Sequence, residues 1–181
     1  VTSMVERVLN KSLNNDGLKL NQIEEQDKIP EIEFGFSIPD EVEKNRFLSI
    51  LSDYNYNTDI HGNIEPGIFK GFVDLVFRWD GKYYILDWKS NKLGENFQSY
   101  SPEHIETEME EKNYNLQYIL YTMAIIKFLS RRIENFDYKK HFGGVFYIFL
   151  RGIDENTVKN GIFFDRPEIT LINRLNQLFN T

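Results

Sequence analysis

The sequence contains no cysteine, and this absence excludes several kinds of site. Disulfide bonds, thiolate zinc sites and cysteine-ligated iron–sulfur clusters all require cysteine sulfur. No stretch reaches the roughly 18 uninterrupted apolar residues of a membrane helix, and the N-terminus has no signal-peptide pattern. We therefore expect a cytoplasmic chain without disulfides and without a membrane partner.

An excess of basic residues is also missing, because 21 Lys and Arg face 28 Asp and Glu and give a net charge of −7. Nucleic-acid binders usually show the opposite balance, since they neutralise phosphates. An acidic domain can still act on nucleic acid when a tethered partner region holds the strand. The charge therefore counts against an isolated DNA-binding domain but not against a tethered one.

The composition is that of an ordinary soluble globular chain, with 41% hydrophobic and 27% charged residues. A length of 181 residues predicts a single domain over residues 1–181, with no internal repeat. Apolar periodicity predicts helices over residues 2–13, from Asp40 to Tyr54, about 102–132 and 168–179. It predicts strands over residues 31–38, 71–79, 82–90 and 145–150.

The strands at 71–79 and 82–90 are joined by an Asp-Gly pair. This pair predicts a type I′ hairpin, because both central residues of that turn need φ > 0. Counting outward from the turn places Asp74 directly opposite Asp87. Lys89 follows two residues after Asp87 and therefore points to the same side of its strand.

Two directly opposed carboxylates repel each other, and a divalent cation offsets that repulsion. Mg²⁺ is typically held by one or two carboxylates and keeps waters that substrate phosphate oxygens can replace. We therefore predict a Mg²⁺ site at Asp74 and Asp87 in a cleft. The opposite face of the hairpin is predicted to be core, and it carries Val73, Leu75, Phe77, Tyr84, Leu86 and Trp88.

The alternative is that these charges are solvated groups on the polar side of an edge hairpin. The apolar neighbours Phe72, Val76 and Ile85 make that alternative less favourable.

Other polar residues can join this cleft. Gln117 and Tyr121 lie four apart on one face of the long predicted helix, with Tyr114 three before Gln117. These tyrosines have an alternative role as core-edge packing. Glu31 and Glu33 share the polar face of the first predicted strand, so either could add a third acidic group to the cleft. Spacing alone does not choose between these two residues. The alternative is that both lie on a solvated strand face.

Four blocks of sequence, in order along the chain, carry a resemblance to a known family: residues 71–77, 81–94, 114–124 and 141–152. They resemble the C-terminal nuclease domain of the beta subunit of exodeoxyribonuclease V (the RecBCD enzyme), within the PD-(D/E)xK nuclease superfamily. The resemblance spans about residues 6–167. It implies an α/β, restriction-endonuclease-like fold with a mixed central sheet flanked by helices, in a C-terminal fragment of a larger helicase–nuclease chain.

The resemblance also implies roles for individual residues. Asp74 and Asp87 match the metal-binding acids of the catalytic site, and Lys89 matches the catalytic lysine. The backbone carbonyl of Trp88 matches a further metal ligand, at a position where tyrosine is more usual. Auxiliary or substrate-contacting roles fall to three more residues: Glu31, Gln117 and Tyr121.

One expected ligand has no counterpart here. The family has a metal-binding histidine on a helix N-terminal to any residue of this sequence, and none of His61, His104 and His141 matches it. Each of these three is better explained as a surface or packing histidine. We therefore expect the isolated 181-residue chain to bind DNA weakly and to cut it poorly.

By resemblance, the chain is a Mg²⁺-dependent DNA exonuclease and endonuclease that hydrolyses phosphodiester bonds during double-strand break repair by recombination. The implied partners are DNA, the other exodeoxyribonuclease V subunits, the helicase part of its own chain and the strand-exchange recombinase. The alternative is a non-catalytic docking module that binds a partner subunit or the recombinase. The acidic balance favours the docking module, whereas the intact set of Asp74, Asp87 and Lys89 favours the nuclease.

Overall fold

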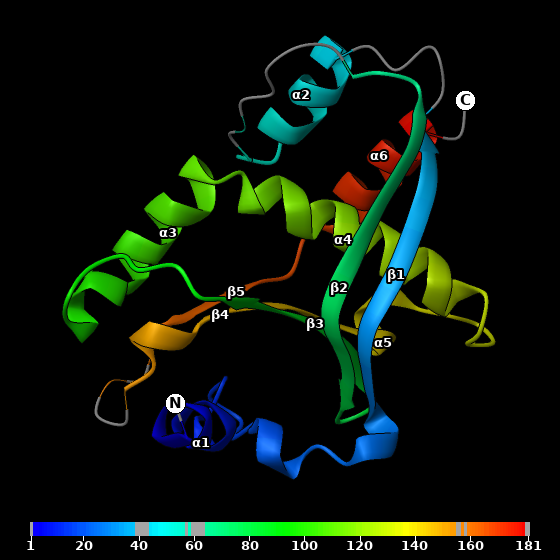
Figure 1. Cartoon of the computed structure of the whole chain (residues 1–181). Coiled ribbons are helices and arrows are strands. Elements are labelled where there is room, and N and C mark those ends of the chain that lie inside the picture. The colour runs from blue at the N-terminus through cyan, green and yellow to red at the C-terminus, as the bar shows by residue number, and fades with distance from the viewer. Residues whose placement is uncertain are drawn as a thin grey trace.

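A five-stranded mixed sheet forms the centre of the structure, a computed structural model that describes residues 2–38, 44–56, 58, 64–154, 157 and 159–179. The strands follow one another across the sheet in chain order: β1 (Lys28–Ile38), β2 (Gly67–Trp79), β3 (Lys82–Lys89), β4 (Phe142–Phe149) and β5 (Ile162–Asp165) (Figure 1). β3 and β4 are parallel, and the other neighbouring strands are antiparallel. The expected α/β fold with a mixed sheet is confirmed.

Helices flank this sheet: α1 (Thr2–Asn10), α2 (Lys44–Ser52), α3 (Pro102–Glu111), α4 (Tyr114–Ser130), α5 (Tyr138–His141) and α6 (Ile169–Phe179). Among the described residues, no helix has the length and apolar content needed to cross a bilayer. The predicted helix N-cap Asp40 lies outside the described residues.

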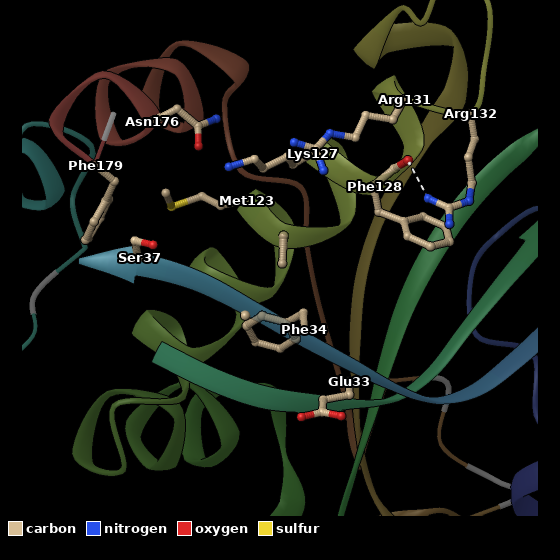
Figure 2. A pocket seen from close by; sticks show the side chains of 12 residues that line it. Glu33, Phe34, Ser37, Met123, Lys127, Phe128, Arg131, Arg132, Asn176 and Phe179 are labelled. Atoms are coloured by element: carbon tan, nitrogen blue, oxygen red, sulfur yellow. Dashed lines mark hydrogen bonds between the residues drawn. The ribbon is translucent and has the colours of Figure 1, made fainter. Parts of the chain in front are cut away.

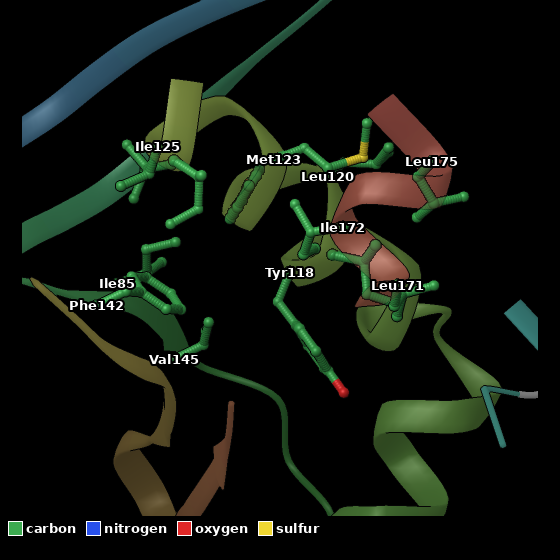
Figure 3. Close-up of a cluster of buried hydrophobic side chains, with 14 of the residues drawn as sticks. Ile85, Tyr118, Leu120, Met123, Ile125, Phe142, Val145, Leu171, Ile172 and Leu175 are labelled. Carbon is green, nitrogen blue, oxygen red and sulfur yellow. The ribbon is translucent and has the colours of Figure 1, made fainter. Parts of the chain in front are cut away.

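The core has two parts, one on each face of the sheet. On one face, Ile85 and Val145 of the sheet pack with Met123 of α4 and Ile172 of α6 (Figure 3). On the other face, residues of α1 and of the segment that follows it pack on Phe77, among others. Strands β3 and β4 are therefore covered on both sides, which agrees with their nearly continuous apolar sequences.

The hairpin between β2 and β3 forms as predicted. Asp80 and Gly81 have φ values of 47° and 74°, the left-handed conformations that a type I′ turn requires. The strands pair in the predicted register from the turn as far as Leu75 and Leu86. The turn was therefore sufficient to predict how these two strands align near it.

Beyond Leu75, β2 leaves β3 but stays paired with β1 as far as Gly67. The two strands run together past α4 as a two-stranded arm (Figure 1). The parting of β2 from β3 thus begins at Asp74, the first residue after the shared ladder.

The prediction of one helix over about 102–132 is wrong, because the chain forms α3 and α4 with a break at Lys112 and Asn113. Asn113 has φ 53° and ψ 30°, a left-handed conformation that asparagine adopts more readily than most residues and that a continuous helix cannot contain. Strand β5, which has four residues, is too short for periodicity to predict.

Helix α4 is held in place by a carboxylate on the edge strand. Asp165 of β5 accepts hydrogen bonds from the hydroxyls of Tyr118 on α4, at 2.8 Å, and of Tyr56 after α2, at 2.7 Å. Burial, followed by the nearby Asp165, raises the pKa of the Tyr118 hydroxyl, so this group stays a proton donor. These bonds tie β5, α4 and the end of α2 together.

We expect Asp165→Ala to lower the free energy of unfolding by about 2–4 kcal/mol, because it leaves two largely buried hydroxyls without their acceptor. Urea unfolding monitored by circular dichroism measures this loss. Asp53→Ala, which removes an exposed ion pair with Arg174, is the control and should cost less than about 1 kcal/mol. Equal losses in the two variants would contradict the anchoring role of Asp165.

Candidate active site

Asp74 lies at the point where β2 and β3 part. The last backbone pair is Leu75 with Leu86, so the expected direct pairing of Asp74 with Asp87 stops one position short. Instead, the Asp74 side chain closes the gap, because its Oδ2 accepts a hydrogen bond from the Trp88 backbone N–H at 2.8 Å. A carboxylate thus replaces a backbone carbonyl as the acceptor at the open end of the ladder.

Asp87 and Lys89 form an ion pair inside the protein. Lys89 Nζ lies 2.7 Å from Asp87 Oδ2, and the two residues are only 8% and 3% exposed. Burial raises the pKa of the Asp87 carboxyl, the Lys89 ammonium opposes this rise, and the nearby Asp74 adds to it. The ammonium therefore supplies the positive charge that a buried carboxylate requires.

The acidic face of the hairpin, predicted to be a cleft, is covered at Asp87 and Lys89, which are buried, whereas Asp74 is partly exposed. Ile85 and Val76, on the same face as Asp87, belong to the core that α4 covers. Val73, predicted for the opposite face, also packs in this core. The expected alternation of a core face and a solvated face fails because helices cover both sides of β3.

Gln117 connects this ion pair to α4. Its Oε1 accepts hydrogen bonds from Lys89 Nζ at 3.1 Å and from the Tyr147 hydroxyl at 2.9 Å. Its Nε2 donates to the Tyr121 hydroxyl at 2.8 Å. Two donors on one side and an acceptor on the other fix the orientation of the amide, so Gln117 and Tyr121 act as one unit beside the acids.

Two tyrosine rings surround the Lys89 ammonium, which lies 3.8 Å from the centre of the Tyr114 ring and 4.8 Å from that of Tyr147. Such cation–π contacts attract the ammonium to the ring faces and help to hold it in place. Tyr147 is not among the predicted site residues, because the apolar sequence of its strand predicts only a buried strand. Parallel pairing with β3 places Tyr147 beside Asp87, and a tyrosine within a buried apolar strand is itself a signal, since its hydroxyl needs a partner.

The tyrosine hydroxyls of this cluster remain proton donors. Burial, then Asp87, raises the pKa of Tyr121 and also raises that of Tyr147. Tyr121 accepts its bond from Gln117, and among the described residues its own O–H has no acceptor. That proton can therefore be donated to a bound group.

The two candidate glutamates lie in different places. Glu31 falls opposite Asp74, between the β1–β2 pairs Pro30↔Leu75 and Ile32↔Val73, and has a left-handed φ of 52°. Its side chain is exposed and contacts neither acid. Glu33 lies 3.8 Å from Lys70, further along the arm. The strand register therefore places Glu31, rather than Glu33, near Asp74.

Histidines are absent from this cluster within the part of the chain that the structure describes. His104 is hydrogen-bonded to Ser101, and His141 accepts from the backbone of Asp137. His61 lies outside the described residues. In the described ranges no three Asp, Glu, His or Cys side chains converge as a metal-binding group, so the oxygens available here come from Asp74, Asp87 and the backbone.

No family model matches the sequence. RecBCD enzyme subunit RecB of Buchnera aphidicola subsp. Acyrthosiphon pisum is 42% identical over 174 residues, covering 94% of this chain and 15% of the relative. The same subunit of Escherichia coli is 36% identical over 186 residues, covering 99% of this chain and 16% of the relative. That of Haemophilus influenzae is 36% identical over 168 residues, with coverage of 92% and 14%.

The chain thus spans about 15% of the length of the curated relatives it matches. The similarity runs through the strands and helices that carry Asp74, Asp87, Lys89, Gln117 and Tyr121, since it covers almost the whole sequence. The predicted resemblance is confirmed, and the chain is homologous over nearly its full length to a segment of the RecB subunit of RecBCD enzymes.

Proposed function

We propose that this chain is a Mg²⁺-dependent deoxyribonuclease domain of the PD-(D/E)xK type, which hydrolyses DNA strands during recombinational repair of double-strand breaks. The observation that carries the proposal is the grouping of Asp74, Asp87 and Lys89 at the open end of the β2–β3 ladder. Gln117 and Tyr121 adjoin them from α4. Cleavage of a phosphodiester requires an activated water and charge stabilisation at the phosphorus, and these side chains suit both requirements.

The donor atoms suit Mg²⁺, which prefers oxygen ligands and uses few protein carboxylates. Asp74 and Asp87 offer carboxylate oxygens. The Trp88 N–H points into the gap beside Asp74, and a strand residue directs its N–H and C=O to the same neighbour, so the Trp88 carbonyl also faces this gap. When bound, the ion would lower the pKa of a coordinated water and polarise phosphoryl oxygens.

Lys89 has two tasks in this proposal. In this structure its ammonium neutralises Asp87, at 2.7 Å. A Mg²⁺ ion held by Asp74 and Asp87 would take over that neutralisation, and the ammonium could then stabilise negative charge on the phosphate. Gln117, Tyr114 and Tyr147 keep Lys89 in place for this second task. The free O–H of Tyr121 offers a further donor to a phosphate oxygen.

The names of the relatives support the wider setting. Each is a subunit of an enzyme complex called RecBCD, and the chain matches only a segment of it. We therefore propose that the domain is part of a longer cytoplasmic helicase–nuclease chain, that it contacts the other exodeoxyribonuclease V subunits, and that it acts on DNA. Contact with a strand-exchange recombinase belongs to the same proposal.

Asp87→Asn should abolish Mg²⁺-dependent cleavage of linear DNA, because it removes one of two carboxylate ligands. Loss of a residue that only hydrogen-bonds to a metal ligand typically lowers metal affinity by about 10- to 100-fold. Because Asp87 would bind the ion directly, we expect a larger fall in Mg²⁺ affinity, measured by isothermal titration calorimetry. Asp16→Asn, at an exposed loop position, is the matched control and should leave both properties unchanged. Cleavage by Asp87→Asn within a few-fold of wild type would show that Asp87 is not catalytic.

Tyr147→Phe should reduce cleavage by about 10- to 100-fold, because it removes the hydroxyl that helps to fix Gln117 beside Lys89. The control is Tyr118→Phe, which removes an equally buried hydroxyl that is bonded to Asp165 instead. Both variants should lose stability, but only Tyr147→Phe should lose activity at a temperature where both are folded. Equal activities would mean that Tyr147 has only a structural role.

Without metal, Asp87→Ala should lower the free energy of unfolding by about 3–5 kcal/mol, because it leaves the buried Lys89 ammonium without its carboxylate. The double variant Asp87→Ala/Lys89→Met should recover most of this loss, since the second change removes the stranded charge. Urea unfolding in the presence of a chelator measures both. If the double variant is no more stable than the single one, Lys89 is not the counter-ion of Asp87.

A further inference from the structure

A groove of about 420 Å³ lies beside β1 (Figure 2), and neither Asp74 nor Asp87 is among the residues that line it. β1 is the edge strand of the sheet, so the groove has a strand as its floor. Helices α4 and α6 form its walls, and Asn176 and Phe179 of α6 lie across it from Lys127 of α4. Glu33, Phe34 and other β1 residues line the floor.

The groove concentrates positive charge on a chain whose net charge is −7. Lys127, Arg131 and Arg132 line it, and all three are exposed. Within the described ranges no carboxylate lies in ion-pair range of any of them, and the lining acid Glu33 is nearest to Lys70, at 3.8 Å. Lys127 and Arg131 are also four residues apart on one helix, where like charges repel.

Aromatic rings accompany these charges. The Arg132 guanidinium lies 3.6 Å from the centre of the Phe128 ring and donates a hydrogen bond to the Phe128 carbonyl. Phe34 rises from β1 into the same groove (Figure 2). The favourable dipole at a helix C-terminus accounts for basic residues there, but it does not account for aromatic rings beside them.

The groove and the acidic site share one face of α4. At intervals of three or four residues this face carries Gln117, Tyr121, Ala124 and Phe128, and it is continued by the C-cap residue Arg131. At 1.5 Å per residue, the helix covers about 21 Å between the first and the last of them. Phe34 connects the two regions as well, because its ring packs edge-on against Tyr121, with 5.3 Å between centres.

We propose that this groove binds a single DNA strand, with Lys127, Arg131 and Arg132 on the phosphates and Phe128 against a base. The proposal rests on the deoxyribonuclease function proposed above and identifies where the strand is held outside the catalytic group. Single-strand sites combine a positive groove with aromatic stacking surfaces, which matches these residues. An acidic peptide would use the cations but would gain less from the aromatic rings.

The test uses the 181-residue chain, a fluorescein-labelled oligothymidylate and a chelator, with fluorescence anisotropy as the readout of binding. The variant Lys127→Gln/Arg131→Gln/Arg132→Gln should bind at least about tenfold more weakly than wild type. The dependence of log affinity on log salt should become shallower by about 0.7 for each cation removed. The matched control Arg78→Gln/Lys112→Gln/Lys159→Gln changes the same charge at exposed positions on other elements and should bind within twofold of wild type.

A second variant tests the stacking part of the proposal. Phe128→Leu keeps an apolar side chain but removes the ring, so binding should weaken about fivefold or more while the salt dependence stays unchanged. The proposal is overturned if the two triple variants bind alike, or if a poly-glutamate peptide binds the groove as tightly as the oligothymidylate does.

Failure of the proposed function gives a different result. Asp87→Asn should keep full binding in chelator, because Asp87 does not line the groove. If wild type binds through the groove but Asp87→Asn cuts DNA as well as wild type does, the nuclease proposal fails and the groove assignment stands. If Asp87→Asn loses binding as the groove variant does, the groove assignment fails.

Discussion

A buried carboxylate cannot remain charged inside a protein without a partner, and Asp87 depends on the Lys89 ammonium 2.7 Å away. Much of the surrounding structure supports that one ion pair. Gln117 holds the ammonium from α4, and the rings of Tyr114 and Tyr147 lie against it. The Lys89 ammonium therefore supplies the positive charge that the buried Asp87 carboxylate requires.

The fold produces this arrangement by parting two strands. β2 and β3 share a ladder up to Leu75 and Leu86, after which β2 continues with β1 alone. Asp74 stands at the parting, and its side chain accepts a hydrogen bond from the Trp88 N–H where the backbone pairing of β2 with β3 has ended. Asp74 thus lies at the open end of the ladder, and the covering helix α4 supplies the polar groups of Gln117 and Tyr121.

Local chemistry made part of this structure predictable. The Asp-Gly turn determines the hairpin register, and the register brings Asp74 close to Asp87 and Lys89. Helical spacing of four residues likewise brings Gln117 and Tyr121 together. Each of these relations depends on residues that are close in sequence or joined by a tight turn, so counting along the chain is sufficient.

Other features depend on contacts between segments that are distant in sequence, so they could not be predicted by counting residue positions along the chain. The ladder between β2 and β3 ends at Leu75, beyond which β2 pairs only with β1. The acidic face is covered because α4 packs over it. Tyr147 joins the site through parallel pairing with β3, more than fifty residues away in sequence. The break at Asn113 rests on one left-handed residue inside an otherwise helical pattern.

Anomalous diffraction from crystals grown with Mn²⁺, which takes oxygen ligands like those of Mg²⁺, tests the central claim most directly. The account predicts a peak bonded to carboxylate oxygens of both Asp74 and Asp87, at about the 2.0–2.1 Å of Mg²⁺–oxygen bonds, with the Trp88 carbonyl as a further ligand. Lys89 Nζ should no longer contact the Asp87 oxygen that it holds in the metal-free site. A map with no peak at these acids and with the Lys89–Asp87 ion pair unchanged would contradict it.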